Sequence, residues 1–348
     1  MIDIIKKFEK NPIISPADVK PSLEGYKVLG AFNPGAIVFG DEIILLLRVS
    51  EGCESKEGFV RVPVCEFKNN EAYPSILEFD LKDPDLSLKD TRGVVYKGKD
   101  YLTSINHIRI ARSKDGIHFT VEDKPFIYPV EESEKYGCED ARVSFIEGKY
   151  YINYTAVSED SWVTSLALTE DFKTVERKGI IFCPENKDVS IFPEKINGKY
   201  IALHRPNNSG FGKASIWYAE SPDLIHWGKH KCLLRPRDNE WESVKIGGGA
   251  PPIKTSEGWL VIYHGRSENS YSLFCLLLDL KDPSKIIKRA ERPLLVPTEA
   301  FETNGFFKNV VFSNGIVEKD GKIYVYYGAA DESVGVAISD IKSLLEIF

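Results

Sequence analysis

The chain contains no run of about twenty consecutive apolar residues, the length that a membrane-spanning helix requires. Its six cysteines are scattered and show none of the paired spacings of zinc sites or disulfide frameworks. Residues 1–7 mix acidic, basic and apolar side chains where a signal peptide would have an apolar core. We therefore predict a protein of the reducing cytoplasm with no membrane segment, no disulfides and no metal site.

Positive charge and helical patterns are also scarce. The 45 lysines and arginines are outnumbered by 52 aspartates and glutamates, and the net charge of −7 disfavours nucleic acid as a partner. Only two terminal segments, Ile2–Phe8 and Ile341–Phe348, are predicted to be helical. An apolar fraction of 43% with 11% aromatic residues is instead typical of a well-buried all-β protein.

One phrase, in contrast, occurs five times: two apolar residues, any residue, and then proline. Its copies are Ile13–Pro16, Phe126–Pro129, Ile181–Pro184, Leu233–Pro236 and Leu294–Pro297. Between the copies, strands rich in β-branched and aromatic residues follow tight turns that contain glycine or aspartate, which indicates antiparallel hairpins. A repeat of about fifty to sixty residues made of such strands predicts a toroidal array. We predict one all-β catalytic domain over residues 1–348, a five-bladed β-propeller.

The number of blades is less certain than the repeat, because hairpins at Gly40 and Gly98 bring the hairpins to six against five proline phrases. We favour five blades, with residues 50–90 as an insertion in the first blade, and keep six blades as the alternative. His118 and His226 occupy the same place in repeated Asp turns, so a structural role is predicted for both.

Polar residues gather where the predicted inner strands end or begin. Aligning the blades on the apolar strand after each turn gives, at the strand ends, Arg48, Asn106 with His107, Tyr154, His204 with Arg205, His264 and Asp331. A structural repeat would keep one residue type at such a position, so this divergence predicts a site. The starts of the same hairpins carry Asn33, Glu139–Arg142, Lys187 with Asp188, Lys245 with Gly247–Gly249, and Asn309. The consecutive glycines are expected to let a ligand approach the backbone.

The charges in this set have an unusual balance. Five of the residues are cationic or can become so, namely Arg48, Lys187, Arg205, Lys245 and His264. Converging cations without matching carboxylates repel one another unless an anion lies between them, and arginine is suited to phosphate. Asp140 is the single acid singled out, whereas hydrolysis with inversion needs an acid and a base. When the attacking group is already an anion the base is unnecessary, so this set favours phosphorolysis.

Several of these residues have a structural alternative. Asp140 could stabilise a turn by pairing with Arg142, and His204 could be a core histidine. Lys187 and Lys245 could be solvated charges at the rim. Trp162 lies in a predicted loop and could stack on a sugar.

The phrases that carry these residues resemble family 130 of the glycoside hydrolases, the β-mannoside phosphorylases, over nearly the whole chain. They are Phe32–Asn33, Arg48, Asp140–Val143, Phe192–Gly198, His204–Pro206, Ser221–Asp223, Lys245–Gly247, Gly258–Gly265 and Tyr326–Asp331. The resemblance implies a five-bladed propeller. It also implies reversible, inverting phosphorolysis of a β-mannoside by inorganic phosphate, which releases α-mannose 1-phosphate and a shortened acceptor.

The resemblance assigns roles to individual positions. Asp140 falls on the general acid, which in this family is thought to act through a hydroxyl of the mannosyl unit. The predicted phosphate-binding residues are Lys187, Arg205, Lys245, His264 and Tyr271. The predicted substrate-binding residues are Asn33, Arg48, Asn106, Tyr154, Asn309 and Asp331. Two departures are Ala141, where the family has proline, and Lys187, where the β-1,4 branch commonly has arginine.

The N-terminal segment from Gly30 and residues 50–110 look more like the branch that acts on β-1,2-mannosides. A β-1,2-mannobiose or mannooligosaccharide phosphorylase is therefore predicted. A β-1,4-mannoside phosphorylase and a β-mannoside hydrolase, with Glu139 or Glu242 as the base, are the alternatives, as is a non-catalytic carbohydrate-binding propeller. The predicted partners are the mannoside, inorganic phosphate and mannose 1-phosphate. No cofactor, nucleic acid or membrane is expected, and a homo-oligomer is compatible with the sequence.

Overall fold

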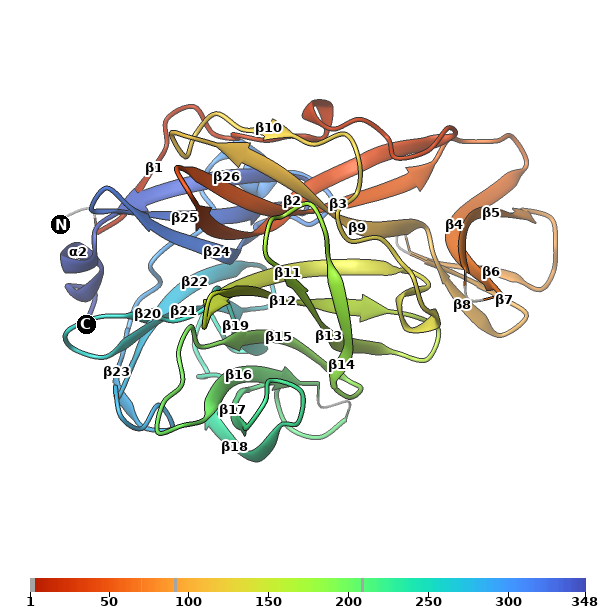
Figure 1. Ribbon diagram of the computed structural model, residues 1–348. Coiled ribbons are helices and arrows are strands. Elements are labelled where there is room, and N and C mark those ends of the chain that lie inside the picture. Colours follow the sequence, from red (N-terminus) through yellow and green to blue (C-terminus); the bar gives the residue numbers. More distant parts are fainter. Residues whose placement is uncertain (1–3, 70, 91–92, 208–209) are drawn as a thin grey trace.

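A computed structural model describes residues 4–69, 71–90, 93–207 and 210–348, and nearly all of its regular structure is β-strand (Figure 1). Within these residues, most strands form five antiparallel groups of four. The first group contains β2 (Tyr26–Phe39), β3 (Glu42–Cys53), β9 (Ser104–Ser113) and β10 (Thr120–Val121). The second contains β11 (Gly137–Ile146), β12 (Lys149–Val157), β13 (Trp162–Thr169) and β14 (Glu176–Phe182). The all-β class is thus confirmed.

The remaining groups follow in chain order. The third contains β15 (Asn186–Ile191), β16 (Tyr200–Pro206), β17 (Ile216–Ser221) and β18 (Gly228–Leu234). The fourth contains β19 (Lys245–Gly248), β21 (Trp259–Arg266), β22 (Tyr271–Leu278) and β23 (Ile286–Arg289), with β20 (Ile253–Lys254) also paired to β21. The fifth contains β24 (Val311–Lys319), β25 (Lys322–Ala329), β26 (Ser333–Ser339) and β1 (Lys6–Lys7). The fifth group therefore takes its outer strand from the beginning of the chain.

The five proline phrases mark the passages between groups. Each lies at the end of the outer strand of one group or after it, and before the first strand of the next, as Phe126–Pro129 does between β10 and β11. Proline ends a strand because it cannot donate a ladder hydrogen bond. The repeated Asp turns are stabilised by their own side chains: Asp115 accepts the His118 backbone N–H and binds its imidazole at 2.7 Å. Asp223 and His226 do the same, which confirms the structural role of both histidines.

The hydrophobic core consists of clusters that consecutive groups share. Ile44 and Ile108 of the first group pack with Ile152 of the second. Similar clusters join the second group to the third, the third to the fourth and the fourth to the fifth. Leu45 of the first group also packs with Val336 of the fifth, so the first and last groups bury a common surface. This is the burial expected of stacked, twisted sheets.

Residues between β3 and β9 form a separate element that projects at one side of the molecule (Figure 1). Its strands are β4 (Phe59–Lys68), β5 (Glu71–Asp80), β6 (Leu86–Asp90), β7 (Gly93–Tyr96) and β8 (Lys99–Leu102). Because β3 and β9 pair directly, with Gly52 opposite Ser104, this segment is an insertion, as predicted. The hairpin at Gly98 belongs to it. Asn106 and His107 are therefore on the third strand of the first group, and their alignment with inner-strand ends was wrong.

Helices are few and short in the described residues. They are the α-helices α1 (Ala300–Thr303) and α2 (Ile341–Leu345) and the 3₁₀ turns η1 (Pro16–Asp18) and η2 (Glu132–Glu134). The helix predicted at the C-terminal end is confirmed over its first five residues by α2. The helix predicted over Ile2–Phe8 is wrong, because Lys6 and Lys7 pair with β26; residues 1–3 lie outside the described residues. No described helix has the length and apolarity to cross a membrane.

Candidate active site

Three polar residues of the site lie in equivalent β-bulges, each in the first strand of a different group. In β2, β11 and β15 the register shifts by one residue, and Asn33, Asp140 and Asp188 lie within the shift. Their φ values are 46°, 50° and 55°. Asn and Asp tolerate this left-handed region better than other non-glycine residues. A bulge re-aims the side chain it carries, and here all three line one cavity.

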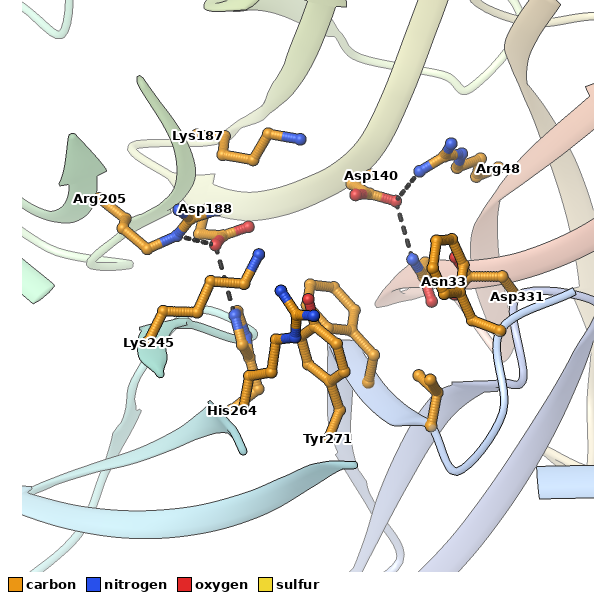
Figure 2. Close-up of a pocket in the computed structure, with 14 residues that line it drawn as sticks. Asn33, Arg48, Asp140, Lys187, Asp188, Arg205, Lys245, His264, Tyr271 and Asp331 are labelled. Carbon is orange, nitrogen blue, oxygen red and sulfur yellow. Dashed lines mark hydrogen bonds and ion pairs between the residues drawn. The ribbon is translucent and has the colours of Figure 1, made fainter. Parts of the chain in front are cut away.

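The cavity has a volume of about 360 Å³, within the range of small-molecule sites (Figure 2). Its lining is mostly polar and charged: Asn33, Arg48, Asp140, Lys187, Asp188, Arg205, Lys245, His264, Arg266, Tyr271, Phe307, Val310, Phe312 and Asp331. Five basic side chains thus face three carboxyl groups. Figure 2 shows two sides, with Asp140, Asn33, Arg48 and Asp331 on one and Asp188, Arg205, Lys245 and His264 on the other.

Asp140 is fixed by two donors on the first side. Its Oδ1 accepts hydrogen bonds from Asn33 Nδ2 at 3.0 Å and Arg48 Nη1 at 3.2 Å. The Arg48 guanidinium is itself held by Asn106 Oδ1 and Glu139 Oε1, both at 3.0 Å. Asn106 therefore positions Arg48 instead of lining the cavity.

The two carboxyls on this side have opposite pKa shifts. Burial alone would raise the pKa of Asp140, but the charges of Arg48 and Lys187 outweigh it and lower that pKa below its ordinary value. Burial raises the pKa of Asp331 to about 6, with repulsion from Asp140 adding to the effect against the attraction of Arg48. Asp140 is therefore ionised in the ligand-free protein, and Asp331 takes up a proton in mildly acidic solution.

The second side is built around Asp188, which the sequence analysis placed at a hairpin start beside Lys187 but to which it gave no role. Its Oδ2 accepts a hydrogen bond from Arg205 Nε at 2.6 Å and lies 3.4 Å from His264 Nε2. Arg205 and His264 therefore face a common point. The prediction that these cations lack a matching carboxylate was wrong. The available signal was the position of Asp188 within its hairpin, which is equivalent to that of Asp140.

Burial alone would raise the pKa of Asp188, but Arg205 and Arg142 hold it well below its ordinary value. Burial lowers the pKa of His264 despite the neighbouring Asp188 charge, so its imidazole is neutral.

Arg142 ties three groups together beneath the site. This fully buried guanidinium donates to the backbone oxygens of Asp140, Gly248 and Gly249 and to Asp188 Oδ1, at 3.0–3.2 Å. The proposed pair between the side chains of Asp140 and Arg142 is therefore absent, and Arg142 instead bonds the Asp140 backbone.

The glycines at the start of β19 make room for side chains. A Cβ on Gly247 would lie 2.6 Å from His264 Nε2 and closer still to Asp188 Oδ2. The close approach predicted at these glycines is thus made by Asp188 and His264.

Four further residues present polar groups to the cavity. Among the described residues, neither Lys187 nor Lys245 has an ion-pair partner; their ammonium groups lie over the rings of Trp162 and Tyr271, at 5.6 and 5.5 Å. Burial lowers the pKa of Lys245 to about 7, with repulsion from Arg205 adding to the shift. Burial raises the pKa of Tyr271 to about 12, so its hydroxyl stays a donor. Arg266, which the sequence analysis missed, stacks on Tyr271 at 5.6 Å.

Besides Asn106, two predicted substrate-binding residues do not line the cavity. Tyr154 is buried and donates to Glu134 at 2.6 Å, because its side chain points into the core between the first two groups. Asn309 donates its amide to the Asn269 carbonyl at 3.2 Å and so links two loops beside the cavity. His204 stacks on Phe182 and bonds Asn186, as its core alternative predicted.

The two bases proposed for a hydrolase do not line the cavity. Glu139 is held by Arg48 and Asn106. Glu242 is fully buried and binds Tyr263, Arg237 and Arg289 in the fourth group. In the described part of the chain, no group of three or more His, Cys, Asp or Glu side chains could hold a metal ion.

The chain is similar to known proteins over most of its length. A model of glycoside hydrolase family 130, described as beta-1,4-mannooligosaccharide phosphorylase, matches residues 87–348. The beta-1,2-mannobiose phosphorylase of Listeria innocua is 47% identical over 352 residues, covering 99% of each chain. The 1,2-beta-oligomannan phosphorylase of Thermoanaerobacter is 44% identical over 72% of this chain and 86% of its own. The beta-1,4-mannooligosaccharide phosphorylase of Ruminococcus albus is 36% identical over 67% and 73%.

Among solved structures, the Listeria innocua beta-1,2-mannobiose phosphorylase in complex with beta-1,2-mannobiose superposes with a TM-score of 0.92 at 46% identity. The superposition covers 99% of this chain and 98% of the other. A family-43 glycoside hydrolase at 14% identity, with a TM-score of 0.59, shares the fold alone.

Proposed function

The chain belongs to glycoside hydrolase family 130, and from this membership we propose that it is a glycoside phosphorylase acting on β-1,2-linked mannosides. Inorganic phosphate is the second substrate. The C1–O bond to the acceptor sugar breaks, a C1–O bond to phosphate forms with inversion, and the acceptor oxygen receives a proton. The products are α-mannose 1-phosphate and a shortened acceptor.

The observation that carries this proposal is the charge of the cavity. Five basic side chains face three carboxyl groups, one of which, Asp188, is occupied by Arg205 and Arg142. The remaining excess of positive charge is what a phosphate dianion would neutralise. A cavity that binds only a neutral sugar and water does not require this excess of positive charge.

In the proposed mechanism phosphate binds among Lys187, Arg205, Lys245 and His264, with the Tyr271 hydroxyl as a neutral donor. The mannosyl unit binds beside Asn33, Arg48 and Asp331. Holding both substrates in line replaces a bimolecular encounter with an oriented reaction, and the cations neutralise the attacking oxygens. Asp188 positions the phosphate site by fixing Arg205 and His264.

Asp140 supplies the proton to the leaving oxygen, directly or through a mannosyl hydroxyl. Arg48 and Lys187 keep it ionised in the free protein. A bound phosphate dianion would offset the field of Lys187 and displace water, and both effects raise the pKa of a carboxyl. Phosphate binding thereby favours the protonated acid that the reaction needs.

The β-1,2 linkage rests on the relatives. The Listeria innocua and Thermoanaerobacter proteins, at 47% and 44% identity, are both named for β-1,2-mannosides, while the β-1,4 enzyme of Ruminococcus albus is 36% identical. Hydrolysis is less well supported, because neither Glu139 nor Glu242 is free to activate water.

We also propose that the five strand groups are the blades of a five-bladed propeller surrounding this cavity. The core shared by the first and fifth groups and the outer strand β1 of the fifth group support a closed ring. No cofactor is proposed, and a homo-oligomer stays a prediction.

The test is release of mannose 1-phosphate from β-1,2-mannobiose by the purified protein, with and without inorganic phosphate. We expect no turnover without phosphate and saturable turnover with it. β-1,4-Mannobiose serves as the comparison substrate and should be cleaved far more slowly. Free mannose appearing at a rate independent of phosphate would overturn the proposal in favour of hydrolysis.

A further inference from the structure

One basic residue that lines the cavity has no role in the proposed mechanism. It is Arg266, which lies opposite Lys245 of β19 on one side and opposite Tyr271 of β22 on the other. Directly opposite residues of antiparallel strands carry their side chains on the same face of the sheet, with Cβ atoms about 5 Å apart. Arg266 therefore lies between two residues predicted to bind phosphate.

The face of β21 that carries Arg266 runs from the core into the cavity. Leu260 and Ile262 pack in the core that the fourth and fifth groups share. Farther along the strand, His264 is 1% exposed, and Arg266, its last residue, is partly exposed. Because side chains alternate between the two faces of a strand, all four lie on one face. Arg266 therefore lies one step farther toward solvent than His264, on the second side of the cavity.

The guanidinium of Arg266 is not matched by a carboxylate. Among the described residues it forms no ion pair and no hydrogen bond, and it lies over the ring of Tyr271 at 5.6 Å. The Lys245 ammonium lies over the same ring at 5.5 Å. Burial lowers the pKa of Lys245 to about 7, and Arg266 is among the charges that add to this shift. Two basic groups are thus held beside one neutral ring, where an anion between them would remove their repulsion.

Arg266 also has donors that the other basic residues lack. Arg205 already gives its Nε to Asp188. Lys187 and Lys245 carry compact ammonium groups, which cannot pair with two oxygens in a plane. Arg266 keeps its whole planar set of N–H donors, whose spacing matches two oxygens of one phosphate. It is the basic residue on this side best suited to a bidentate contact.

On the basis of the proposed function, we propose that Arg266 binds two oxygens of inorganic phosphate and, in the reverse reaction, of the phosphate group of mannose 1-phosphate. Arg266 and Lys245 then share one dianion. Stacking on Tyr271 holds the guanidinium in place beforehand, so less conformational entropy is lost when phosphate binds. The mannoside is neutral, so its binding does not depend on Arg266.

The experiment measures phosphorolysis of β-1,2-mannobiose, with separate KM values for phosphate and for the mannoside. Arg266→Met keeps an apolar stem over Tyr271 but has no donors. It should raise the KM for phosphate roughly ten- to a hundredfold and leave the KM for mannobiose near its original value. Arg266→Lys keeps the charge without the planar donors and should give a smaller increase. Arg292→Met, at an exposed arginine absent from the cavity lining, is the matched control for the loss of one positive charge.

Inorganic phosphate without the mannoside gives a second readout. It should raise the melting temperature of the unaltered protein and of Arg292→Met. At the same concentration it should raise that of Arg266→Met much less, because the dissociation constant for phosphate is larger. A purely structural role would lower the melting temperature in phosphate-free buffer and leave the increase caused by phosphate unchanged.

The possible results separate the two proposals. If the unaltered protein releases no mannose 1-phosphate, the proposed function fails, and the inference that rests on it fails as well. If it does release it, and Arg266→Met leaves the KM for phosphate unchanged, Arg266 does not bind phosphate. Equal increases in both KM values would also overturn the inference, since they would mean that Arg266 only supports the shape of the cavity.

Discussion

Asp140 and Asp188 occupy equivalent bulges but have different surroundings. Asp188 contacts three basic side chains, Arg205, Arg142 and His264, so all its acceptor capacity goes to positioning them. Asp140 is contacted through one oxygen by Asn33 and Arg48, which leaves the other oxygen for a ligand. At the scale of single residues, the neighbours of a carboxylate decide whether it orients the site or reacts in it.

Replacing Asp140 with asparagine tests its proposed role without disturbing the fold. Asparagine also tolerates φ near +50°, and its oxygen can still accept from Asn33 and Arg48. We expect phosphorolysis to fall about a thousandfold, the size of a general-acid contribution, with an unchanged melting temperature. Glu139→Gln, which alters the adjacent carboxylate held by Arg48, is the control and should lose much less. Retained activity in Asp140→Asn would remove Asp140 from the mechanism.

The lowered pKa of Lys245 predicts how phosphate affinity depends on pH. Because burial brings this pKa to about 7, the ammonium is charged below pH 7 and loses its proton above it. An anion needs the charged form, so phosphate binding above pH 7 must include proton uptake. We expect the KM for phosphate to rise between pH 7 and 8.5, by at most about tenfold per pH unit. Arginine stays charged over this pH range, so Lys245→Arg should remove the part of the increase in KM that deprotonation of Lys245 causes. If the KM for phosphate depends on pH in the same way in this variant, Lys245 is not the titrating group.

At the scale of elements, β-bulges in the first strands of the groups direct side chains into the cavity. They recur in β2, β11, β15 and β24, and they place Asn33, Asp140 and Asp188. In β19 no shift occurs, and glycines at the equivalent place leave the room that Asp188 and His264 occupy. Side chains from one group thus fill the space left by the next.

Gly247→Ala tests this packing. The added Cβ would overlap His264 Nε2 and Asp188 Oδ2, and both would have to move. Because Asp188 also fixes Arg205, we expect the KM for phosphate to rise about tenfold while the KM for the mannoside changes little. Gly228→Ala, where the structure has nothing within 4 Å of the added atom, should be unaffected. Unchanged phosphate kinetics in Gly247→Ala would mean that Asp188 and His264 do not position the phosphate.

At the scale of the whole molecule, the beginning of the chain joins the last two groups. β1 supplies the outer strand of the fifth group, and Lys7 Nζ donates to Glu302 Oε2 at 2.5 Å and to Val296 O at 2.9 Å. Glu302 is fully buried and also accepts from Tyr327 at 2.8 Å. This contact ties together residues nearly three hundred positions apart in the chain.

Lys7→Met should therefore destabilise the whole fold. It keeps the apolar stem but leaves the buried Glu302 charge without its ion-pair partner, which costs about 2–3 kcal/mol. Chemical denaturation followed by fluorescence would give the free energy of unfolding. Lys6→Met is the matched control, since its pair with Glu9 is exposed on both sides and should contribute almost nothing. Equal stability of the two variants would show that the contact does not hold the groups together.

Much of the element order followed from local patterns. The proline phrases, the glycine turns and the Asp–His turns at Asp115 and Asp223 depend on residues within a few positions of one another, so their structures could be predicted. The prediction of a short helix at Ile2–Phe8 was wrong because Lys6 and Lys7 pair with β26, which is distant in the sequence. The prediction for Tyr154 was wrong because side chains alternate between the two faces of β12, and Tyr154 lies on the face that packs in the core shared with the first group.

The sequence by itself determined the all-β class, the five-fold repeat, the insertion after the second strand, the family and most of the cavity lining, including Asp140, Arg205 and His264. These depend on residue types and spacings that one chain segment carries. Only the tertiary structure decided that Asp188 matches the cations, that Arg142 joins three groups beneath the site, and that Arg266 and Phe307 line the cavity. Those contacts join residues of different strand groups. The charge around such a side chain and its burial depend on strands that are far from it in the sequence, so the local sequence does not reveal them.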